Sequence, residues 1–315
     1  MQRGNGNENE PVKGETTMIR HRLAPLGLAI MLFFLSILAT GPVTQWLAGL
    51  DIKPGVIATA SENTIPSLFT GTILQQAAIK SGEIPMYGSS EFSHGGVYNP
   101  MKLFAGHPTG WTPYLVGHAG STDLIQALYA CAQDLQGRKI VLSLSAQWFS
   151  ARGIAQTTFA GNFSALQAYK MLANPHLSVQ TKTDFAHRLL QFNEVRRSYP
   201  VLAKMLEYYG QPGIQAHLLE AAYWPAGQLE LSALEIQDLW KTIKVIKHLP
   251  PQQIARNAAP TASRKLPPWS RLMRKATADV KARETNNPYG INNQFFKQKL
   301  TNYKKQHDSA VVGRR

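Results

Sequence analysis

The sequence predicts an α/β fold, a parallel sheet of the doubly wound kind with a helical insertion, preceded by one transmembrane helix. Three observations lead to this prediction. Residues 23–43 form a long apolar run, residues 83–145 alternate between strand-like and helix-like stretches, and residues 155–247 show apolar side chains at helical spacing. Because ligands of doubly wound sheets bind at the carboxyl ends of the strands, we expect the chemistry there.

The N-terminal run predicts a membrane anchor. Residues 23–43 carry no charged side chain and just reach the length of about 20 residues that a helix needs to cross a bilayer. A cleaved signal peptide is the alternative, but the run is long for one and residues 40–43 make a poor cleavage site. We therefore expect an uncleaved, single-pass anchor in the cell membrane, with Trp46 at its outer interface.

The charges on the two sides of this run predict its orientation. Lys and Arg are more frequent before the run than after it: Arg3, Lys13, Arg20 and Arg22 precede it, and Lys53 follows. By the positive-inside rule, residues 1–22 form a cytoplasmic tail and the main domain, residues 51–248, lies outside the cell. This location excludes nucleic acid as a partner and leaves cell-surface polyanions and lipid headgroups.

Helices and strands alternate in the first part of the domain. We expect a helix over residues 51–81 that Gly82 ends, and a second helix that Ser121 caps and Gly137 ends. The expected strands are residues 83–87, 112–116 and 140–145. Since the last of these is almost continuously apolar, we expect it to be covered on both faces.

The remainder is predicted to be helical and then basic. A capping box at residues 232–235 predicts the start of one helix, and residues 202–209 predict another. Residues 249–315 are rich in proline and hold 14 Lys or Arg against three Asp or Glu, in a chain of net charge +14. This segment suits a polyanion, with a solvated linker as the alternative. Within it, residues 269–280 predict a basic amphipathic helix that lies on an anionic membrane or packs on the domain.

Several kinds of chemistry have no motif in the chain. It contains no CxxC, HExxH, Walker loop or GxGxxG, so we expect neither a cofactor nor a metal. The single cysteine, Cys131, lies in an apolar helical run and is expected to be a buried, unreactive thiol.

Ser90 is the candidate nucleophile. It ends the run Gly88-Ser89-Ser90, directly after the first expected strand, which is where a serine hydroxyl can be presented at the edge of a sheet. Such a run is also common in ordinary turns. A serine needs a base to remove its proton and donors for the oxyanion that develops. The candidate donors are the backbone N–H groups of Gly117 and Gly120 and the side-chain amide of Gln147; a tight turn and a surface amide are the alternatives.

Taken together, three blocks resemble the DltD family, which acts in the D-alanylation of lipoteichoic acid. The blocks are residues 85–92, 113–120 and 145–149, with further similarity at residues 69–76 and 285–291. Residue 146 is alanine where the family often has proline. The resemblance, which covers roughly residues 23–299, implies an SGNH-hydrolase-like (flavodoxin-like) domain with Ser90 as nucleophile. It also implies three partners: lipoteichoic acid, the D-alanyl carrier protein and a membrane O-acyltransferase.

The base is left unassigned. The family's catalytic Asp and His lie near the C-terminus, and residues 300–315 do not resemble that segment, so we expect the chain to be truncated or frameshifted relative to the family. The pair Asp184 and His187 has a suitable spacing but is expected on a solvated helix. His94 and His118 are the other histidines near the candidate site.

Three hypotheses for function remain. The first is a D-alanyl ester transferase or esterase whose base comes from the missing segment or from a partner. The second is a catalytically incomplete membrane scaffold that binds the carrier protein or the acyltransferase. The third is a defective fragment, in which missing strands leave apolar edges exposed.

Overall fold

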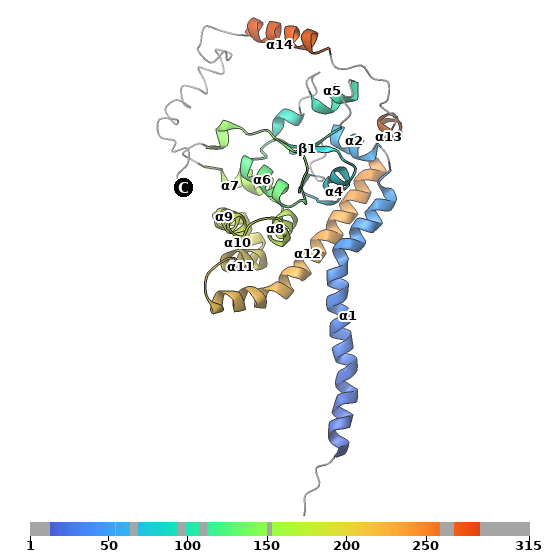
Figure 1. Ribbon diagram of the computed structural model, residues 1–315, viewed down its shortest axis with the longest axis vertical. Helices are drawn as coiled ribbons and strands as arrows, with labels where there is room; N and C mark the ends of the chain where they lie inside the picture. The colour runs from blue at the N-terminus through green and yellow to red at the C-terminus, as the bar shows by residue number, and fades with distance from the viewer. Residues whose placement is uncertain are drawn as a thin grey trace, which may run out of the picture.

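The computed structural model describes residues 13–53, 55–63, 69–93, 99–106, 112–149, 153–258 and 268–283. Most of this part is helical, and it contains a small parallel sheet and one long N-terminal helix that projects from the folded body (Figure 1). The predicted parallel sheet and the predicted long apolar helix are therefore confirmed.

Helix α1 spans Lys13–Asp51. Its stretch Pro25–Asp51 contains an 18-residue window with a mean hydropathy of 2.2, and the stretch is long and apolar enough to cross a membrane. Most of its large apolar side chains are exposed, whereas a core helix of a soluble domain would bury them. Length and composition fit both a membrane anchor and a signal sequence.

The described sheet has three strands in the order β2-β1-β3, all parallel. Strand β1 is Ile84–Tyr87, β2 is Pro113–Val116 and β3 is Val141–Leu142. Tyr87 lies level with Val116 on one side and with Leu142 on the other. The three strands therefore end at one edge of the sheet.

Helices pack on this sheet and supply most of the core. Tyr87, Tyr114, Leu128 and Phe159 are among the fully buried side chains of one large cluster that joins the sheet to the helices. The elements near the sheet are α2 (Val56–Glu62), α4 (Ile73–Lys80), the 3-10 helix η1 (Ser90–Ser93), α5 (Pro100–Gly106), α6 (Asp123–Cys131) and the 3-10 helix η2 (Ala146–Phe149).

The later helices form the predicted helical part. They are α7 (Gln156–Ala160), α8 (Ala165–Ala173), α9 (Val179–Leu189), α10 (Asn193–Ser198), α11 (Pro200–Tyr208), α12 (Ile214–His248), α13 (Pro251–Ala258) and α14 (Trp269–Arg283). The helix predicted at residues 202–209 is confirmed as α11.

Two predicted helices have different bounds. The single helix expected over residues 51–81 is wrong, because the chain forms the separate helices α2 and α4 there. Gly55, which precedes α2, has a left-handed backbone conformation. The cap expected at Ser121 is also wrong. Thr122 caps α6 by accepting the Ile125 N–H, and the helix ends at Cys131, before the expected Gly137.

Strand β3 is shorter and more exposed than predicted. The apolar run predicted a strand over residues 140–145 that is covered on both faces, but only Val141 and Leu142 pair with β1. Leu142 is 42% exposed and Leu144 63% exposed. Within the described residues β3 is an edge strand without helical cover on its apolar side chains.

The capping box predicted at residues 232–235 does not start a helix. Ser232 and Glu235 lie inside α12, which continues through Pro225. The Ser232 hydroxyl donates to the carbonyl of Ile37 in α1, and Glu235 forms an ion pair with Lys170 of α8. The polar side chains that resemble a cap thus join α12 to its neighbours.

The start of the basic segment is folded on the body. In α13, Arg256 forms an ion pair with Glu62 of α2 at 2.7 Å, and Gln253 accepts a hydrogen bond from Asn63. In α14 the side chains of Trp269 and Met273 are exposed, so the expected packing of this helix on the domain is wrong for these residues.

We predict that the buried carboxyl of Glu83 makes stability pH-dependent. Burial raises its pKa to about 8, and its Oε2 has no hydrogen-bond partner among the described residues. An acid whose pKa rises on folding stabilises the fold below its unfolded pKa and loses that contribution as pH rises through the folded value. The free energy of unfolding should fall between about pH 4.5 and pH 8, by at most about 5 kcal/mol.

Unfolding of the full chain in mild detergent, followed by circular dichroism across this pH range, measures the slope. Glu83→Gln should flatten it. Asp184, which is exposed on α9, provides the matched control, and Asp184→Asn should keep the slope. An unchanged slope in Glu83→Gln would contradict the assignment.

Candidate functional site

The candidate site begins where β1 and β2 end side by side. The Gly88 N–H donates to the Val116 carbonyl at 3.0 Å, so the pairing continues past both strands. Gly117 has φ of +137°, and a Cβ there would collide with the carbonyl oxygen of Gly88. A Cβ at Gly88 would lie 2.5 Å from the ring of Phe92. The missing side chain of Gly117 thus lets the two backbones approach this closely, and that of Gly88 leaves room for the Phe92 ring.

Ser90 is exposed at the first position of η1, directly after this contact. Its neighbour Ser89 is buried and holds the turn. The Ser89 hydroxyl donates to the His118 carbonyl at 3.3 Å, and its N–H donates to Oε1 of Glu91 at 2.8 Å. The turn is therefore fixed to the loop after β2, with the Ser90 side chain on the surface.

His118 lies beside this turn. Its backbone N–H donates to the Ser121 hydroxyl at 3.1 Å, and its ring Nδ1 lies 3.1 Å from the Ala119 carbonyl oxygen. The ring also contacts Phe69. Burial lowers the pKa of His118 below its usual value, which favours the neutral imidazole near pH 7. When Nδ1 carries the proton and donates to Ala119, Nε2 is left as an acceptor.

Asp123 connects this region to the end of β3. Its Oδ1 accepts the Ser145 N–H at 3.2 Å, and its Oδ2 is buried without a hydrogen-bond partner among the described residues. Burial raises the pKa of Asp123, with a smaller contribution from the nearby charge of Glu91. Asp123 was not among the site residues predicted from the sequence. Its position at the start of α6 was the available signal, but helix starts commonly hold an acidic residue for structural reasons.

The oxyanion candidates lie in the loops after β2 and β3. Gly120 has φ of +85°, and a Cβ there would lie 3.1 Å from Nδ2 of Asn162. In the same turn the backbone N–H of His118 donates to the Ser121 hydroxyl. Gln147 lies in η2, and its side chain is outside the described part. The backbone thus brings the three loops to one edge, while the catalytic roles remain predictions.

The other histidines have different surroundings. Asp184 and His187 are exposed on α9, and Asp184 accepts a hydrogen bond from Gln180 at 2.9 Å. This agrees with the prediction of a solvated helical turn. His94 is outside the described residues.

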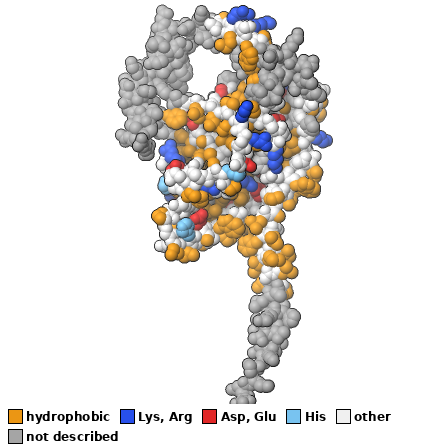
Figure 2. Space-filling model, viewed as in Figure 1, with side chains coloured by type: hydrophobic (Ala, Val, Ile, Leu, Met, Phe, Trp, Pro, Cys, Tyr) orange, Lys and Arg blue, Asp and Glu red, His pale blue; other side chains and the backbone are white. Residues whose placement is uncertain are grey.

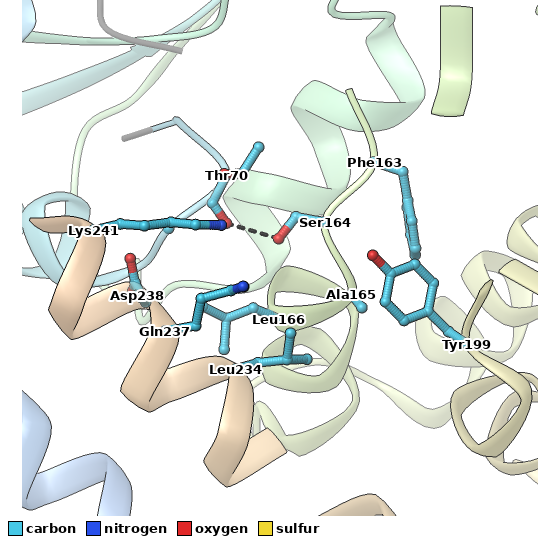
Figure 3. A pocket seen from close by; sticks show the side chains of 11 residues that line it. Thr70, Phe163, Ser164, Ala165, Leu166, Tyr199, Leu234, Gln237, Asp238 and Lys241 are labelled. Carbon is cyan, nitrogen blue, oxygen red and sulfur yellow. Dashed lines mark hydrogen bonds between the residues drawn. The ribbon is translucent and has the colours of Figure 1, made fainter. Parts of the chain in front are cut away.

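A cavity of about 250 Å³ lies between α12 and α8 (Figure 3). Several of its polar groups hold neighbouring elements together. The Ser164 hydroxyl donates to the Thr70 carbonyl at 2.7 Å, and Asp238 accepts the N–H groups of Thr72 and Ile73 at the start of α4. Burial raises the pKa of Asp238, and the hydrogen bonds from Thr72 and Ile73 offset only part of this rise. Ser90 does not line this cavity, which we interpret as part of the framework.

Metal-binding groups and the cysteine add nothing to the site. In the described ranges, no three His, Cys, Asp or Glu side chains lie close enough to hold a metal ion. Cys131 is partly buried at the end of α6, and burial raises the pKa of its thiol, which makes it less reactive.

Residues 61–311 match the profile of the protein family described as DltD protein. Protein DltD of Bacillus subtilis (strain 168) is 32% identical over 274 residues. Protein DltD of Staphylococcus aureus (strain NCTC 8325 / PS 47) is 27% identical over 275 residues, and that of Lacticaseibacillus rhamnosus is 25% identical over 247 residues.

These relatives are longer than the chain. The alignments cover 86%, 84% and 78% of this chain, but 67%, 66% and 56% of the respective relatives. The chain thus spans about two thirds of the first two relatives and just over half of the third.

We predict that Gly117→Ala destabilises the protein more than Gly137→Ala does. Both glycines have positive φ, but only at Gly117 does a Cβ meet another backbone; at Gly137 it meets nothing within 4 Å. Backbone strain of about 1–3 kcal/mol applies to both variants, and the collision adds to it only at Gly117. Denaturant unfolding of the two variants measures the difference. Equal losses would contradict the close contact between Gly117 and Gly88.

Proposed function

Since the chain belongs to the DltD family, we propose that it acts in the D-alanylation of lipoteichoic acid at the outer face of the cell membrane. Family membership implies a role in teichoic acid D-alanylation. For the reaction itself, the proposal is that this chain transfers or hydrolyses a D-alanyl ester through Ser90. The observation that carries it is the exposed position of Ser90 after the central strand, next to the loop of His118.

The proposed reaction passes through an acyl-enzyme. The Ser90 oxygen attacks the carbonyl carbon of a D-alanyl ester or thioester, and a base accepts the hydroxyl proton. An ester to Ser90 forms, the bond to the donor's alcohol or thiol breaks, and that group leaves with the proton. A hydroxyl of the polymer, or water in hydrolysis, then attacks the acyl-enzyme and restores the serine.

Oxyanion stabilisation is assigned to the loops after β2 and β3. The amides of Gly117 and Gly120 and the side chain of Gln147 are the proposed donors. Removing one such donor typically lowers the rate about 10²–10³-fold. The close approach of Gly117 to the Gly88 backbone supports this role, since it keeps the loop beside the serine turn.

Two sources of the base are open to test. The resemblance implies an Asp and a His on a segment that residues 300–315 do not match. His118 is the alternative within the described part, because its loop contacts the serine turn and its lowered pKa favours the form that accepts a proton.

For the fold, we propose an SGNH-hydrolase-like domain whose sheet continues beyond β3. The exposed apolar side chains of Leu142 and Leu144 support it, because an uncovered apolar edge strand is unfavourable in water. In this proposal α1 is an uncleaved anchor, the body lies outside the cell, and the basic segment after α12 contacts the phosphates of lipoteichoic acid. The D-alanyl carrier protein and the membrane O-acyltransferase are the proposed protein partners.

A non-enzymatic scaffold is the second candidate function. It is favoured by the basic segment, which offers a surface for a polyanion, together with the unassigned base. The same chain would then position the carrier protein or the acyltransferase without forming an acyl-enzyme.

We predict that Ser90→Ala abolishes ester hydrolysis and D-alanyl transfer by the full chain in proteoliposomes. The loss should reach several orders of magnitude, because no acyl-enzyme can form. Ser81→Ala is the matched control, since Ser81 is also exposed but bonds to the Ala77 carbonyl at the end of α4; it should keep full activity. Equal rates in the two variants would remove Ser90 from the mechanism.

The histidines separate the sources of the base. If His118 is the base, His118→Ala should lower activity by orders of magnitude, while His187→Ala, on the exposed face of α9, should leave it unchanged. Full activity in His118→Ala would instead favour a base supplied by another segment or a partner. If the unsubstituted chain has no turnover but restores D-alanylation in cells that lack it, the scaffold is supported.

A further inference from the structure

We propose that the N-terminal part of α12, residues 214–229, lies on the outer surface of the lipid bilayer and inserts its exposed apolar side chains among the headgroups and the upper acyl chains. The proposal goes beyond acyl transfer, and it rests on the proposed role of α1 as an uncleaved anchor. It identifies a membrane-contacting surface on the folded body in addition to the spanning helix.

The register between α12 and α1 places this segment near the bilayer. The Ser232 hydroxyl donates to the Ile37 carbonyl at 3.1 Å, and a Cβ at Gly41 would lie 2.7 Å from Oε1 of Glu235. Both helices run in the same direction along this contact (Figure 1). Residues before Ser232 therefore lie level with Ile37 or closer to the N-terminal end of α1.

The length of α1 below this contact is too short to keep the body away from lipid. From Arg22, the last charged residue before the apolar run, to Ile37 the helix rises roughly 22 Å. The hydrocarbon core of a bilayer is about 30 Å thick. With residue 22 at the inner boundary of this core, the outer boundary therefore lies beyond Ile37. Tilt of α1 would reduce the depth it covers further.

The shape of α12 suits a helix in the plane of the membrane. In Figure 1 its first part runs across the direction of α1 at the lower border of the body, and the rest turns to run beside α1. Pro225 lies inside the helix, and an internal proline kinks a helix by removing one backbone hydrogen bond.

The exposed side chains of this part include four large apolar ones beside the polar Gln215 and His217. Ile214 is 80% exposed, Leu218 is 65% exposed, and Trp224 and Leu229 are also exposed. Ile214 and Leu218 share one helix face by their spacing of four residues. Figure 2 shows hydrophobic side chains along the lower border of the body and where α1 leaves it. Such a surface, beside a membrane-spanning helix, fits the boundary between headgroups and acyl chains.

The charges indicate that insertion is driven by apolar burial. Residues 205–240 contain no Lys or Arg, and Glu220 is the one acidic residue between Ile214 and Leu229. Its carboxylate lies 3.9 Å from Nδ1 of His217, on a different side of the helix from Leu218. Binding should therefore not depend on anionic lipid, and zwitterionic phosphatidylcholine is the appropriate probe.

Depth measurements on the full chain test the proposal. In a Cys131→Ala background, Ile214→Cys and Leu218→Cys are each labelled with a nitroxide, and the chain is reconstituted in phosphatidylcholine vesicles. Val179→Cys is the matched control, because Val179 is apolar and 61% exposed but lies on α9 rather than on α12. We expect collisions with oxygen to rise, and collisions with a water-soluble nickel complex to fall several-fold, at positions 214 and 218 relative to position 179.

Three results would overturn the proposal. The labels at positions 214 and 218 could be as accessible to the nickel complex as the label at position 179. They could be protected only in native membranes that contain other proteins, which would indicate a protein partner at this face. Extraction of the chain by alkaline carbonate would remove the anchor on which the proposal depends. None of these readouts requires ester transfer, so a failed assay of Ser90 leaves the membrane contact intact.

Discussion

The parallel register of β1 with both of its neighbours is the constraint on which the rest of the structure depends. Tyr87 lies level with Val116 and Leu142, so the chain leaves three strands at one edge. At that edge Gly88 and Gly117 bring their backbones into contact. The turn after Gly88 consequently lies beside the loop of His118, with Ser89 buried and Ser90 exposed. The proposed chemistry thus starts from backbone packing.

A second set of polar contacts fixes the body on α1. Ser232 bonds to the Ile37 carbonyl, and the ion pair of Glu235 with Lys170 lies beside Gly41. Buried polar groups of this kind favour one register over others, because a slipped helix would leave them unpaired. Since α12 contacts both α1 and the helical part of the body, its position sets the orientation of the body relative to α1. In Figure 1 the sheet lies above α12, away from the free end of α1. The proposed membrane contact and the proposed reaction therefore use different faces.

The comparisons and the structure support different parts of the functional proposal. Family membership gives the pathway, since the match covers most of the chain. The structure gives the surroundings of the candidate residues: an exposed Ser90, a neighbouring imidazole whose pKa is lowered by burial, and Asp123, which bonds to the loop after β3. The uncovered apolar edge at β3 is the observation behind the proposal of a larger sheet than the three described strands.

The sequence alone determined the elements that depend on local pattern. Residues 23–43 predicted the apolar helix, and Gly88-Ser89-Ser90 predicted a serine turn after a strand, because hydrophobic periodicity and glycine conformation act over a few residues. Only the tertiary structure decided the use of side chains between distant elements. Ser232 and Glu235 have the sequence of a helix cap but bind Ile37 and Lys170, and the apolar run at residues 140–145 lies at an open edge. The position of Asp123 beside Ser145 likewise depends on the packing of α6 against the sheet, which no local pattern encodes.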